Sequence, residues 1–560
     1  MVNSELSRRS FLAKGAATGG IVALGVGAGS ALAGCSSGSS SSSTTAASSG
    51  TPGVSTATPV KGGTAIIGIT AESDGFLPAT NHWDANGILY ANTVYDPLAA
   101  VARDGSIQPY LAESITPNAT YTQWTVTLRS GVTFHDGSPL TAQVVVNNFE
   151  AIRSSPLTGT ALSAVSSAEV TGPLTLVFNC PKPYVPLPAA LTTQVGYVVA
   201  QSMLDAAAAN PNAAPTPVGT GPFVYSVWEP NDHFTATRNP NYWRSGFPYL
   251  DSITYKPIPD TSQAEATLRT GGVDLIVSRY AETVNDFKGD SNYQVFDSLM
   301  VKTGEPDMDF IMLNGLSAPT NDLNVRRALA MAIDQTVVQK LFGGGLTQPA
   351  NGVFPPTSKY YTDTGFPTYN PSEATKLINA YKAQHGPVSI ALTTITSPIV
   401  AKVAQVVQQM WQQVGVTTTI KPIEESEFID ILVTGGYEAA ISEQFSAPDP
   451  SINYVWWSTT TVKPNGQIAL NFARNSDPQI EQALLTGRSS SDEAAVVAAY
   501  QEVDKRLGAD IPYIWLGQTV WSAIGNLTIQ NYANPTLPDG TPQLQFDNGD
   551  FVPTQIWMKP

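Results

Sequence analysis

Residues 15–59 carry no charged side chain, and this run limits which part of the chain can fold into a packed body. Seven of the twenty residues from Gly15 to Gly34 are glycine, which makes that stretch a weak helix former and only weakly apolar. Residues 36–59 are mostly Ser and Thr and cannot form a core, so they predict a flexible tether. The fold must therefore be built from the residues that follow position 59.

The first part of this N-terminal region is typical of an export signal. Arg8-Arg9 stand in a segment that resembles a twin-arginine signal, although Sec signals can also carry paired arginines. Leu32-Ala33-Gly34-Cys35 resembles the lipobox of a bacterial lipoprotein, which implies cleavage before Cys35 and attachment of lipid to its thiol. The resemblance implies a signal peptide at 1–34 and a lipidated Cys with a flexible linker at 35–60. A plain signal anchor with an incidental Cys is the alternative.

Composition narrows the class of protein that the remaining residues can form. A chain of 560 residues with 42% hydrophobic residues is long enough for two or three lobes with sizeable cores. Its 45 acidic and 29 basic residues give a net charge of −16, which argues against nucleic-acid binding. Two cysteines and four scattered histidines support neither a disulfide scaffold nor a metal centre, and no cofactor is predicted. Cys180 ends an apolar strand pattern and is expected to be a buried, inert thiol.

Strand and helix patterns are mixed along the chain without a short repeat period, which predicts an α/β protein. The expected strands include residues 65–69, 121–128 and 132–135. The expected helices include one capped by Thr141, one that begins at Asn370-Pro371, one over 397–414, and one over 494–507 after a capping box at Ser490–Glu493.

Residues 131–142 read Gly-Val-Thr-Phe-His-Asp-Gly-Ser-Pro-Leu-Thr-Ala, which strongly resembles the signature of the peptide/nickel class of ABC-transporter solute-binding proteins, family 5. Six further segments resemble landmarks of that family in the same order, and together they span about Gly62 to Thr528. These segments are 219–223, 239–243, 268–274, Asn314 with 325–334, 369–374 and 510–514. Each motif is short, and their shared order carries the resemblance.

The resemblance implies the two-lobed periplasmic-binding-protein fold, in which an extra domain is inserted in the first lobe. Lobe one is expected at 60–108, 215–311 and 517–560, the inserted domain at 109–214, and lobe two at 312–516. The lobes are expected to hinge about a cleft, where a ligand favours the closed state only through contacts that the open state lacks.

The loop Ser442–Pro450 is implied by the family to run from lobe two into the cleft, which makes Glu443, Phe445, Ser446 and Asp449 candidate ligand contacts. Peptide-binding members place an Asp three residues before the acid of an Asp/Glu-Pro pair, where it neutralises the α-ammonium of the ligand. Asp449-Pro450 is present here, but Ser446 holds the position of that Asp. Glu443 could serve as a displaced carboxylate, and Asp449 could instead cap the following turn.

Aromatic residues are the other candidate ligand contacts. Trp83 follows the first strand of lobe one, and Trp456-Trp457 follow the cleft loop, so their rings could stack on a sugar, an aromatic ring or an apolar peptide side chain. Packing in the core or the hinge is the alternative for each Trp. His82 is either a ligand contact or a surface-loop residue.

Other polar motifs are interpreted as structural. The His135-Asp136 pair precedes Gly137 in a tight turn, and 219–222 form a turn rather than a phosphate cradle because Pro222 removes a donor. Arg326-Arg327 could bind an anion but are expected to pack the lobe. Gly-x-Ser-x-Gly occurs only at 34–38, inside the region that resembles a lipobox and linker, and His-Glu-x-x-His does not occur, so no enzymatic activity is predicted.

These observations predict a monomeric, lipid-anchored protein on the extracytoplasmic face of the membrane. It would capture a small solute, a peptide or another polar organic molecule such as an oligosaccharide, and deliver it to the permease and ATPase of an ABC importer. A secreted cell-wall hydrolase and a ligand-sensor subunit with the same fold are the alternatives.

Overall fold

The computed structural model describes residues 51–81, 83–155, 158–211, 214–301, 307–444, 447, 449–546 and 549–560. The predicted signal peptide and Cys35 lie outside the described residues, as do three of the candidate contacts, His82, Phe445 and Ser446. No described helix is long and apolar enough to cross a membrane.

The predicted linker contacts the folded body at Gly53. The Gly53 amide donates to Oε1 of Gln294 at 3.2 Å, and the Gly53 carbonyl accepts from the Ala533 amide at 3.0 Å. Gly53 has a φ of +70°, and a Cβ there would lie 2.7 Å from the Tyr532 ring. The backbone of this segment can therefore approach lobe one closely, which Ser/Thr-rich composition did not predict.

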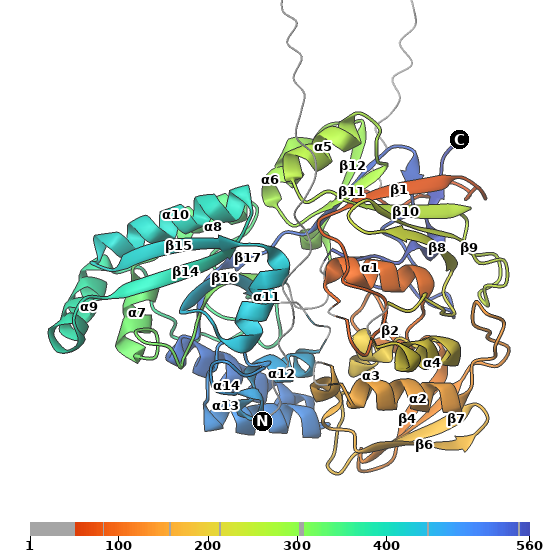
Figure 1. Cartoon of the computed structure of the whole chain (residues 1–560), viewed down its shortest axis with the longest axis horizontal. Coiled ribbons are helices and arrows are strands. Elements are labelled where there is room, and N and C mark those ends of the chain that lie inside the picture. Colours follow the sequence, from red (N-terminus) through yellow and green to blue (C-terminus); the bar gives the residue numbers. More distant parts are fainter. Residues whose placement is uncertain are drawn as a thin grey trace, which may run out of the picture. The chain divides into compact units, whose positions relative to one another are not determined.

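Lobe one is built on a sheet in which the described residues supply seven strands, in the order β12-β18-β11-β1-β10-β9-β8 (Figure 1). β1 is parallel to β10 and β11, and the other neighbouring pairs are antiparallel. The strands are β1 (Thr64–Ile69), β8 (Phe223–Glu229), β9 (His233–Arg238), β10 (Ser252–Pro257), β11 (Leu275–Ser278), β12 (Tyr293–Asp297) and β18 (Ser522–Asn526). Helices α5 (Thr261–Arg269) and α6 (Ala281–Phe287) also belong to this lobe.

Helix α1 (Ala85–Val94) packs on this sheet and carries residues of the candidate site. It begins where the Asp84 carboxylate accepts a hydrogen bond from the Gly87 amide at 2.9 Å, which satisfies a free N–H of the first turn. Thr93 hydrogen-bonds the hydroxyl of Tyr255 in β10 at 2.8 Å, inside the core. These two contacts fix both ends of α1 relative to lobe one.

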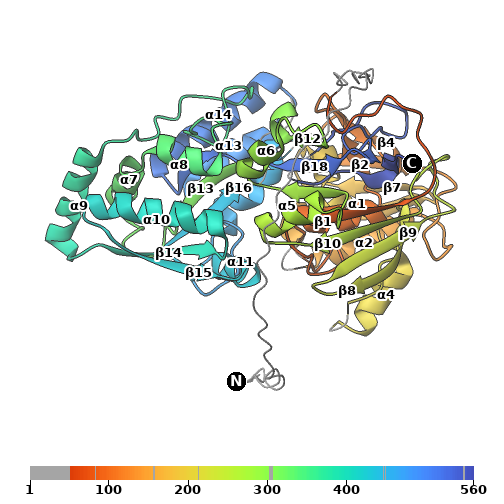
Figure 2. The same cartoon turned by 90° about the horizontal axis from the view of Figure 1, so that it is seen from above.

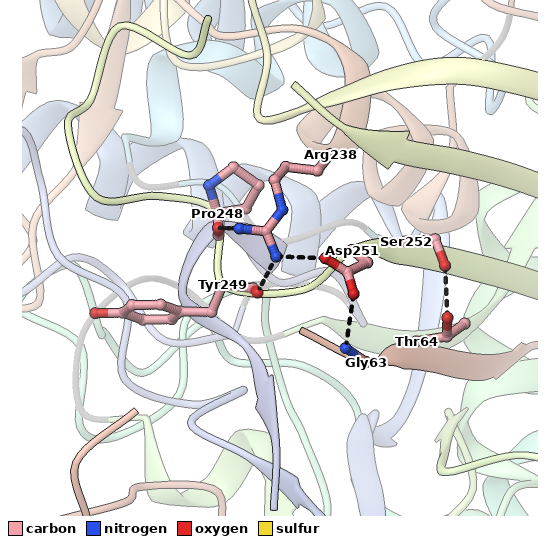
Figure 3. A network of polar contacts seen from close by, with 7 residues as sticks. All are labelled: Gly63, Thr64, Arg238, Pro248, Tyr249, Asp251 and Ser252. Carbon is pink, nitrogen blue, oxygen red and sulfur yellow. Dashed lines mark hydrogen bonds and ion pairs between the residues drawn. The ribbon is translucent and has the colours of Figure 1, made fainter. Parts of the chain in front are cut away.

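A network of polar contacts surrounds the start of β1 and β10 (Figure 3). Arg238 donates to Asp251 at 2.7 Å, and Asp251 accepts from the Gly63 amide at 3.1 Å. Thr64 and Ser252, which are paired in the register of β1 and β10, join their hydroxyls at 2.6 Å. The side chain of Asp251 is 66% exposed, so this network orders the turn before β10 while adding little stability.

The inserted region contains a second sheet, in which four described strands have the order β4-β5-β7-β6. It comprises β4 (Ala112–Pro117), β5 (Gln123–Leu128), β6 (Ser167–Gly172) and β7 (Thr175–Asn179), with helices α2 (Ala142–Arg153), α3 (Leu187–Ala190) and α4 (Gln201–Ala209). A separate hairpin pairs β2 (Ala99–Val101) with β3 (Ile107–Pro109). Thr141 caps α2 as predicted, and Cys180 is buried after β7. The strand expected at 132–135 is wrong, because Thr133 makes only an isolated bridge to Pro139.

Lobe two has a sheet whose described strands follow the order β15-β14-β16-β13-β17, with α8 and α10 packed beside it (Figures 1 and 2). The strands are β13 (Met308–Leu313), β14 (Ser389–Ile395), β15 (Thr417–Ile423), β16 (Ala439–Gln444) and β17 (Tyr513–Gln518). The helices are α7 (Leu323–Met331), α8 (Gln335–Phe342), α9 (Pro371–His385), α10 (Pro398–Gln413), α11 (Glu425–Thr434), α12 (Tyr454–Trp457), α13 (Pro478–Ser489) and α14 (Glu493–Asp510).

Two of the helix starts predicted for lobe two occur where expected, and one differs. Asn370 caps α9, and α10 spans almost the whole range predicted for it. The cap of α14 is Asp492 rather than Ser490, because the Asp492 carboxylate accepts from the Ala494 amide at 3.1 Å. The Ser490 hydroxyl accepts instead from the Asp492 amide, one step outside the helix.

The described residues between the two large sheets are 298–301, 307 and 519–521. The Thr519 amide donates to the Asp307 carbonyl at 2.9 Å, and the Trp521 indole donates to the Asp307 carboxylate at 2.5 Å. The boundaries expected at 311/312 and 516/517 fall inside β13 and β17, which pair entirely within lobe two. The crossings therefore lie just outside these strands, where Asp307 contacts Thr519 and Trp521.

Candidate functional site

A cavity of about 320 Å³ is lined by lobe one, the inserted region and lobe two. Lobe one contributes the start of α1 and a C-terminal segment from Gln543 to Thr554. The inserted region contributes Tyr197, and lobe two contributes Asn453 and Trp456. Residues from both predicted lobes therefore surround one cavity.

Trp83 lines this cavity from lobe one. Its indole stacks on Tyr95 with ring centroids 6.1 Å apart and meets the ring of Tyr197 edge-on at 5.6 Å. The indole N–H donates to the Gly75 carbonyl at 3.1 Å. The ring is therefore held in place before any ligand arrives, while part of it stays accessible.

Trp456 and Trp457 are adjacent in α12 but have different surroundings. Trp456 lines the cavity and packs on Phe472 with ring centroids 4.9 Å apart. Trp457 is 2% exposed, lies in the core of lobe two against Phe354, and does not line the cavity. Successive residues of a helix point about 100° apart, so only one of the pair can face the cavity.

Asp449 also lies outside the cavity lining. Its carboxylate accepts a hydrogen bond from the Ser451 amide at 2.8 Å and caps the 3₁₀ turn Pro450–Asn453. The capping role that the sequence left open as an alternative is the one that the structure shows. Ala447, from the same loop, is buried and does line the cavity.

Glu443 does not act as a displaced carboxylate in the cavity, because it is already paired. Its carboxylate accepts from Arg279 at 2.5 Å, and Asp309 lies 3.9 Å from the same guanidinium nitrogen. Burial raises the pKa of Glu443, and it raises the pKa of Asp309 to about 7 while the Arg279 charge opposes both shifts. Arg279 directly follows β11 of lobe one and Glu443 lies in β16 of lobe two, so this pair joins the lobes.

The described residues that line the cavity include three carboxylates and no Lys, Arg or His. Asp96 accepts hydrogen bonds from Thr220, Tyr242 and Trp243 at 2.8–3.0 Å, so it is a structural group. Asp84 caps α1, and burial raises the pKa of Asp84. Asp550 lies in the C-terminal segment. Sequence reasoning did not single out these carboxylates, because isolated aspartates in loops give no pattern.

The two motifs predicted as turns, at 135–137 and 219–222, do not line the cavity, and they contact each other beside the end of α1. His135 accepts from the Gly219 amide at 3.3 Å through Nδ1, and its Nε2 lies 3.0 Å from the Gly221 carbonyl oxygen. A Cβ on Gly219 would lie 2.0 Å from the Val94 carbonyl oxygen, so the motif needs glycine where it passes the end of α1. The turn interpretation of the His135-Asp136 motif is confirmed, since the Gly137 amide donates to the Phe134 carbonyl at 2.9 Å and Gly137 has the expected positive φ of 83°, whereas 219–222 is a bend rather than a turn.

Arg326 donates to the carbonyl oxygens of Asp510 at 2.7 Å and Thr320 at 3.0 Å, so it packs lobe two as expected. Among the described residues, no group of three or more His, Cys, Asp or Glu could hold a metal ion.

The family model for bacterial extracellular solute-binding proteins, family 5 (middle region), matches residues 106–466. The chain belongs to this family. Glutathione-binding protein GsiB of Salmonella paratyphi A is 24% identical over 453 residues, which cover 77% of this chain and 85% of that protein. The matched residues include the whole inserted region, the middle part of lobe one and most of lobe two.

Solved structures show the same fold. The oligopeptide-binding protein AppA of Bacillus subtilis, in complex with a nonapeptide, has a TM-score of 0.77 at 20% identity and covers 90% of this chain and 100% of its own. The periplasmic binding protein DppA of Helicobacter pylori, in complex with the peptide STSA, has a TM-score of 0.78 at 21% identity and covers 90% and 99%. The two-lobed α/β fold predicted from the motifs is confirmed.

Proposed function

We propose that this family 5 protein is a lipid-anchored receptor that captures a small solute between its lobes and delivers it to an ABC importer. The observation that carries this proposal is the single cavity lined by Trp83 of lobe one and Trp456 of lobe two. A ligand that touches both faces gains contacts that exist only when the lobes are together, so it favours the closed state. The importer's permease then distinguishes closed from open, and no covalent step is required of this chain.

The solute is a small polar organic molecule with an apolar or flat part. Aromatic rings line the cavity next to amide and carboxylate groups, a combination suited to such a ligand. Peptides are the first class to test, because AppA and DppA are described in complex with peptides. The partners are the permease and ATPase of the importer, and the receptor acts as a monomer.

Anchoring rests on Cys35 and on the uncharged linker that follows it. We expect Cys35→Ala to leave a protein that is soluble or uncleaved. A cleaved Cys35→Ala protein that stays in the membrane fraction would contradict lipidation. Changing both Arg8 and Arg9 to Lys should abolish export by the twin-arginine route, and unchanged export would indicate Sec.

The central experiment combines native mass spectrometry with small-angle scattering on the folded body purified without denaturation. We expect a bound solute in the mass spectrum and a smaller radius of gyration with solute than after its removal. Trp83→Ala and Trp456→Ala should each weaken retention of the solute at least tenfold. A radius that no candidate solute changes, together with turnover of one of them, would contradict the receptor function.

A further inference from the structure

The described interior of the protein contains two large hydrophobic clusters. One cluster includes buried residues of lobe one and of the inserted region, such as Ile67 and Phe178, and the other consists of buried residues of lobe two. Side chains within one cluster move together, because protein interiors are closely packed. Contacts that join the two clusters away from the chain crossings are therefore the contacts that a hinge motion would break.

One such contact joins the inserted region to lobe two. Arg488 lies in the last turn of α13, and its carbonyl accepts a hydrogen bond from the Val185 amide at 3.0 Å. Cζ of Arg488 lies 4.8 Å from the ring centroid of Tyr184. Tyr184 is held within the inserted region, since its carbonyl accepts from the Trp124 indole at 2.9 Å. A backbone hydrogen bond and a ring contact thus meet at one point between the two clusters.

The guanidinium of Arg488 lies against aromatic rings of both regions. Its Cζ is 4.0 Å from the ring centroid of Tyr454, in lobe two, and 4.8 Å from that of Tyr184. Arg488 is 7% exposed, and its Nε has no hydrogen-bond partner within the described part of the chain. The face of an aromatic ring attracts a guanidinium, and this attraction is stronger where water is excluded. The two rings are therefore the groups that stabilise this buried cation.

Helix α12 connects this contact with the cavity. Tyr454 begins α12, and Trp456 in the same helix lines the cavity. The Tyr454 hydroxyl donates to Glu481 of α13 at 3.0 Å, which ties α12 to the helix that carries Arg488. A motion that separates Tyr184 from Arg488 would therefore also move Trp456 away from the part of the cavity wall that the inserted region supplies.

The contact is suited to reversible closing. On opening, Arg488 would keep the ring of Tyr454, lose the ring of Tyr184 and regain water. The hydration that the guanidinium regains offsets part of the attraction that it loses. A contact with a small net free energy biases the equilibrium between open and closed states without locking it.

We propose that Arg488 and Tyr184 form a clasp that holds the closed state of the receptor and slows release of its solute. The clasp acts without touching the solute, because neither residue lines the cavity. It gives the inserted region a part in closing the cleft. The inference rests on the proposed receptor function and names residues that set its rate of release.

Hydrogen exchange at Val185 tests the clasp without any ligand. The Val185 amide donates across the contact, so it exchanges with solvent when the contact opens. Arg488→Met removes the cation and keeps an unbranched apolar side chain on the same helix. In protein stripped of solute, exchange of the Val185 amide should be at least about threefold faster in Arg488→Met than in the unchanged protein. Equal rates would overturn the inference.

The neighbouring amide is an internal control. The Tyr184 amide donates to the Tyr121 carbonyl at 2.9 Å, within the inserted region, so opening of the contact leaves this hydrogen bond in place. Pro183 and Pro186 carry no amide hydrogen, so a peptide that ends at these residues reports Tyr184 and Val185 alone. Exchange should rise at Val185 and stay unchanged at Tyr184. A rise at both amides would mean that the inserted region loosens as a whole, and it would contradict the clasp.

Two further variants separate closing from folding. Tyr184→Leu removes the other half of the clasp and should speed Val185 exchange as Arg488→Met does. The double variant should add nothing further, because either change breaks the same contact. Arg269→Met is the matched control, since Cζ of Arg269 lies 4.1 Å from the ring centroid of Phe287 inside lobe one. Additive effects in the double variant, or an equal effect of the control, would contradict the clasp.

These outcomes are separable from the receptor function itself. In native mass spectrometry, Arg488→Met should lose the co-purified solute at least about threefold faster than the unchanged protein. A protein that binds and compacts around its solute, but whose Val185 exchange and solute release are the same in Arg488→Met, would keep the receptor function and overturn the clasp. Faster Val185 exchange in a protein that never binds a solute would overturn the receptor function and leave only the contact itself standing.

Discussion

Carboxylates lie both at the junction of the lobes and in the cavity lining, and the two regions differ in how they use them. At the junction of the lobes, Glu443 and Asp309 lie beside Arg279, which comes from the opposite lobe. In the cavity, the Asp84 carboxylate caps α1, and Asp550 lies in the C-terminal part of the lining. A carboxylate that pairs with a cation of the other lobe holds the protein's own parts together, whereas the cavity lining offers its surface to a guest molecule.

We expect the largest loss of stability when Arg279, the cation at the junction of the lobes, is removed. Arg279→Ala leaves two carboxylates whose side chains are 10% and 6% exposed, without their counter-charge. We expect the free energy of unfolding to fall by about 3–5 kcal/mol, measured by urea denaturation at pH 8, where the carboxylates are ionised.

Arg153→Ala is the matched control for this prediction. Arg153 pairs with Glu150 at 2.6 Å, but both side chains are more than 40% exposed. Its loss should change the free energy of unfolding by less than about 1 kcal/mol. Equal losses in the two variants would mean that the junction pair is no stronger than a surface pair.

The pH dependence of stability offers a second test of the junction. In the folded protein Asp309 keeps its proton up to about pH 7, whereas the unfolded chain releases it near its ordinary pKa of 3.8. Between pH 3.8 and about 7 the native state therefore binds more protons than the unfolded state. The stabilising contribution of Asp309 is thus fully present below about pH 4 and is lost as the pH rises through 7.

Asp309→Asn removes this titration. The free energy of unfolding of the variant should fall less than that of the unchanged protein between pH 4.5 and 7.5, by on the order of 2 kcal/mol. Urea denaturation across this range measures the difference. Parallel curves for the two proteins would show that Asp309 ionises normally in the folded state.

The cavity should show the opposite behaviour, with a small effect on folding and a large one on binding. Trp456 is half-buried and packs on Phe472, so Trp456→Ala should lower the free energy of unfolding by no more than about 1.5 kcal/mol. Retention of the co-purified solute should fall at least tenfold in the same variant. A variant that unfolds easily but retains solute would place Trp456 with the core rather than with the cavity.

Local signals explain the parts of the fold that could be predicted. Thr141 and Asn370 cap their helices as expected, because a cap depends on a side chain and an amide three residues away. The predicted strand at 132–135 failed because a strand needs a partner, and Thr133 finds only one bridge. The linker prediction failed at Gly53 for the same kind of reason, since its partners Gln294 and Ala533 are distant in sequence.

The candidate site was predicted less completely than the fold. Trp83 and Trp456 were singled out, and both line the cavity. Trp457 and Asp449 were singled out for the same reason. In the structure, however, Trp457 packs against Phe354 and Asp449 caps a 3₁₀ turn. Position in a cleft loop does not say which of two neighbouring side chains faces the cleft, because that depends on the helix that follows.

The amino-acid sequence by itself determined the family and its two-lobed fold, because ordered turn motifs, caps and hydrophobic patterns are local and survive in a single chain. Only the tertiary structure decided that Glu443 belongs to Arg279, 164 residues away, rather than to a ligand. It also decided that the segment from Gln543 to Thr554 lines the same cavity as Trp83. Burial and pairing of charges depend on which distant segments pack together, and that information is absent from any short stretch of sequence.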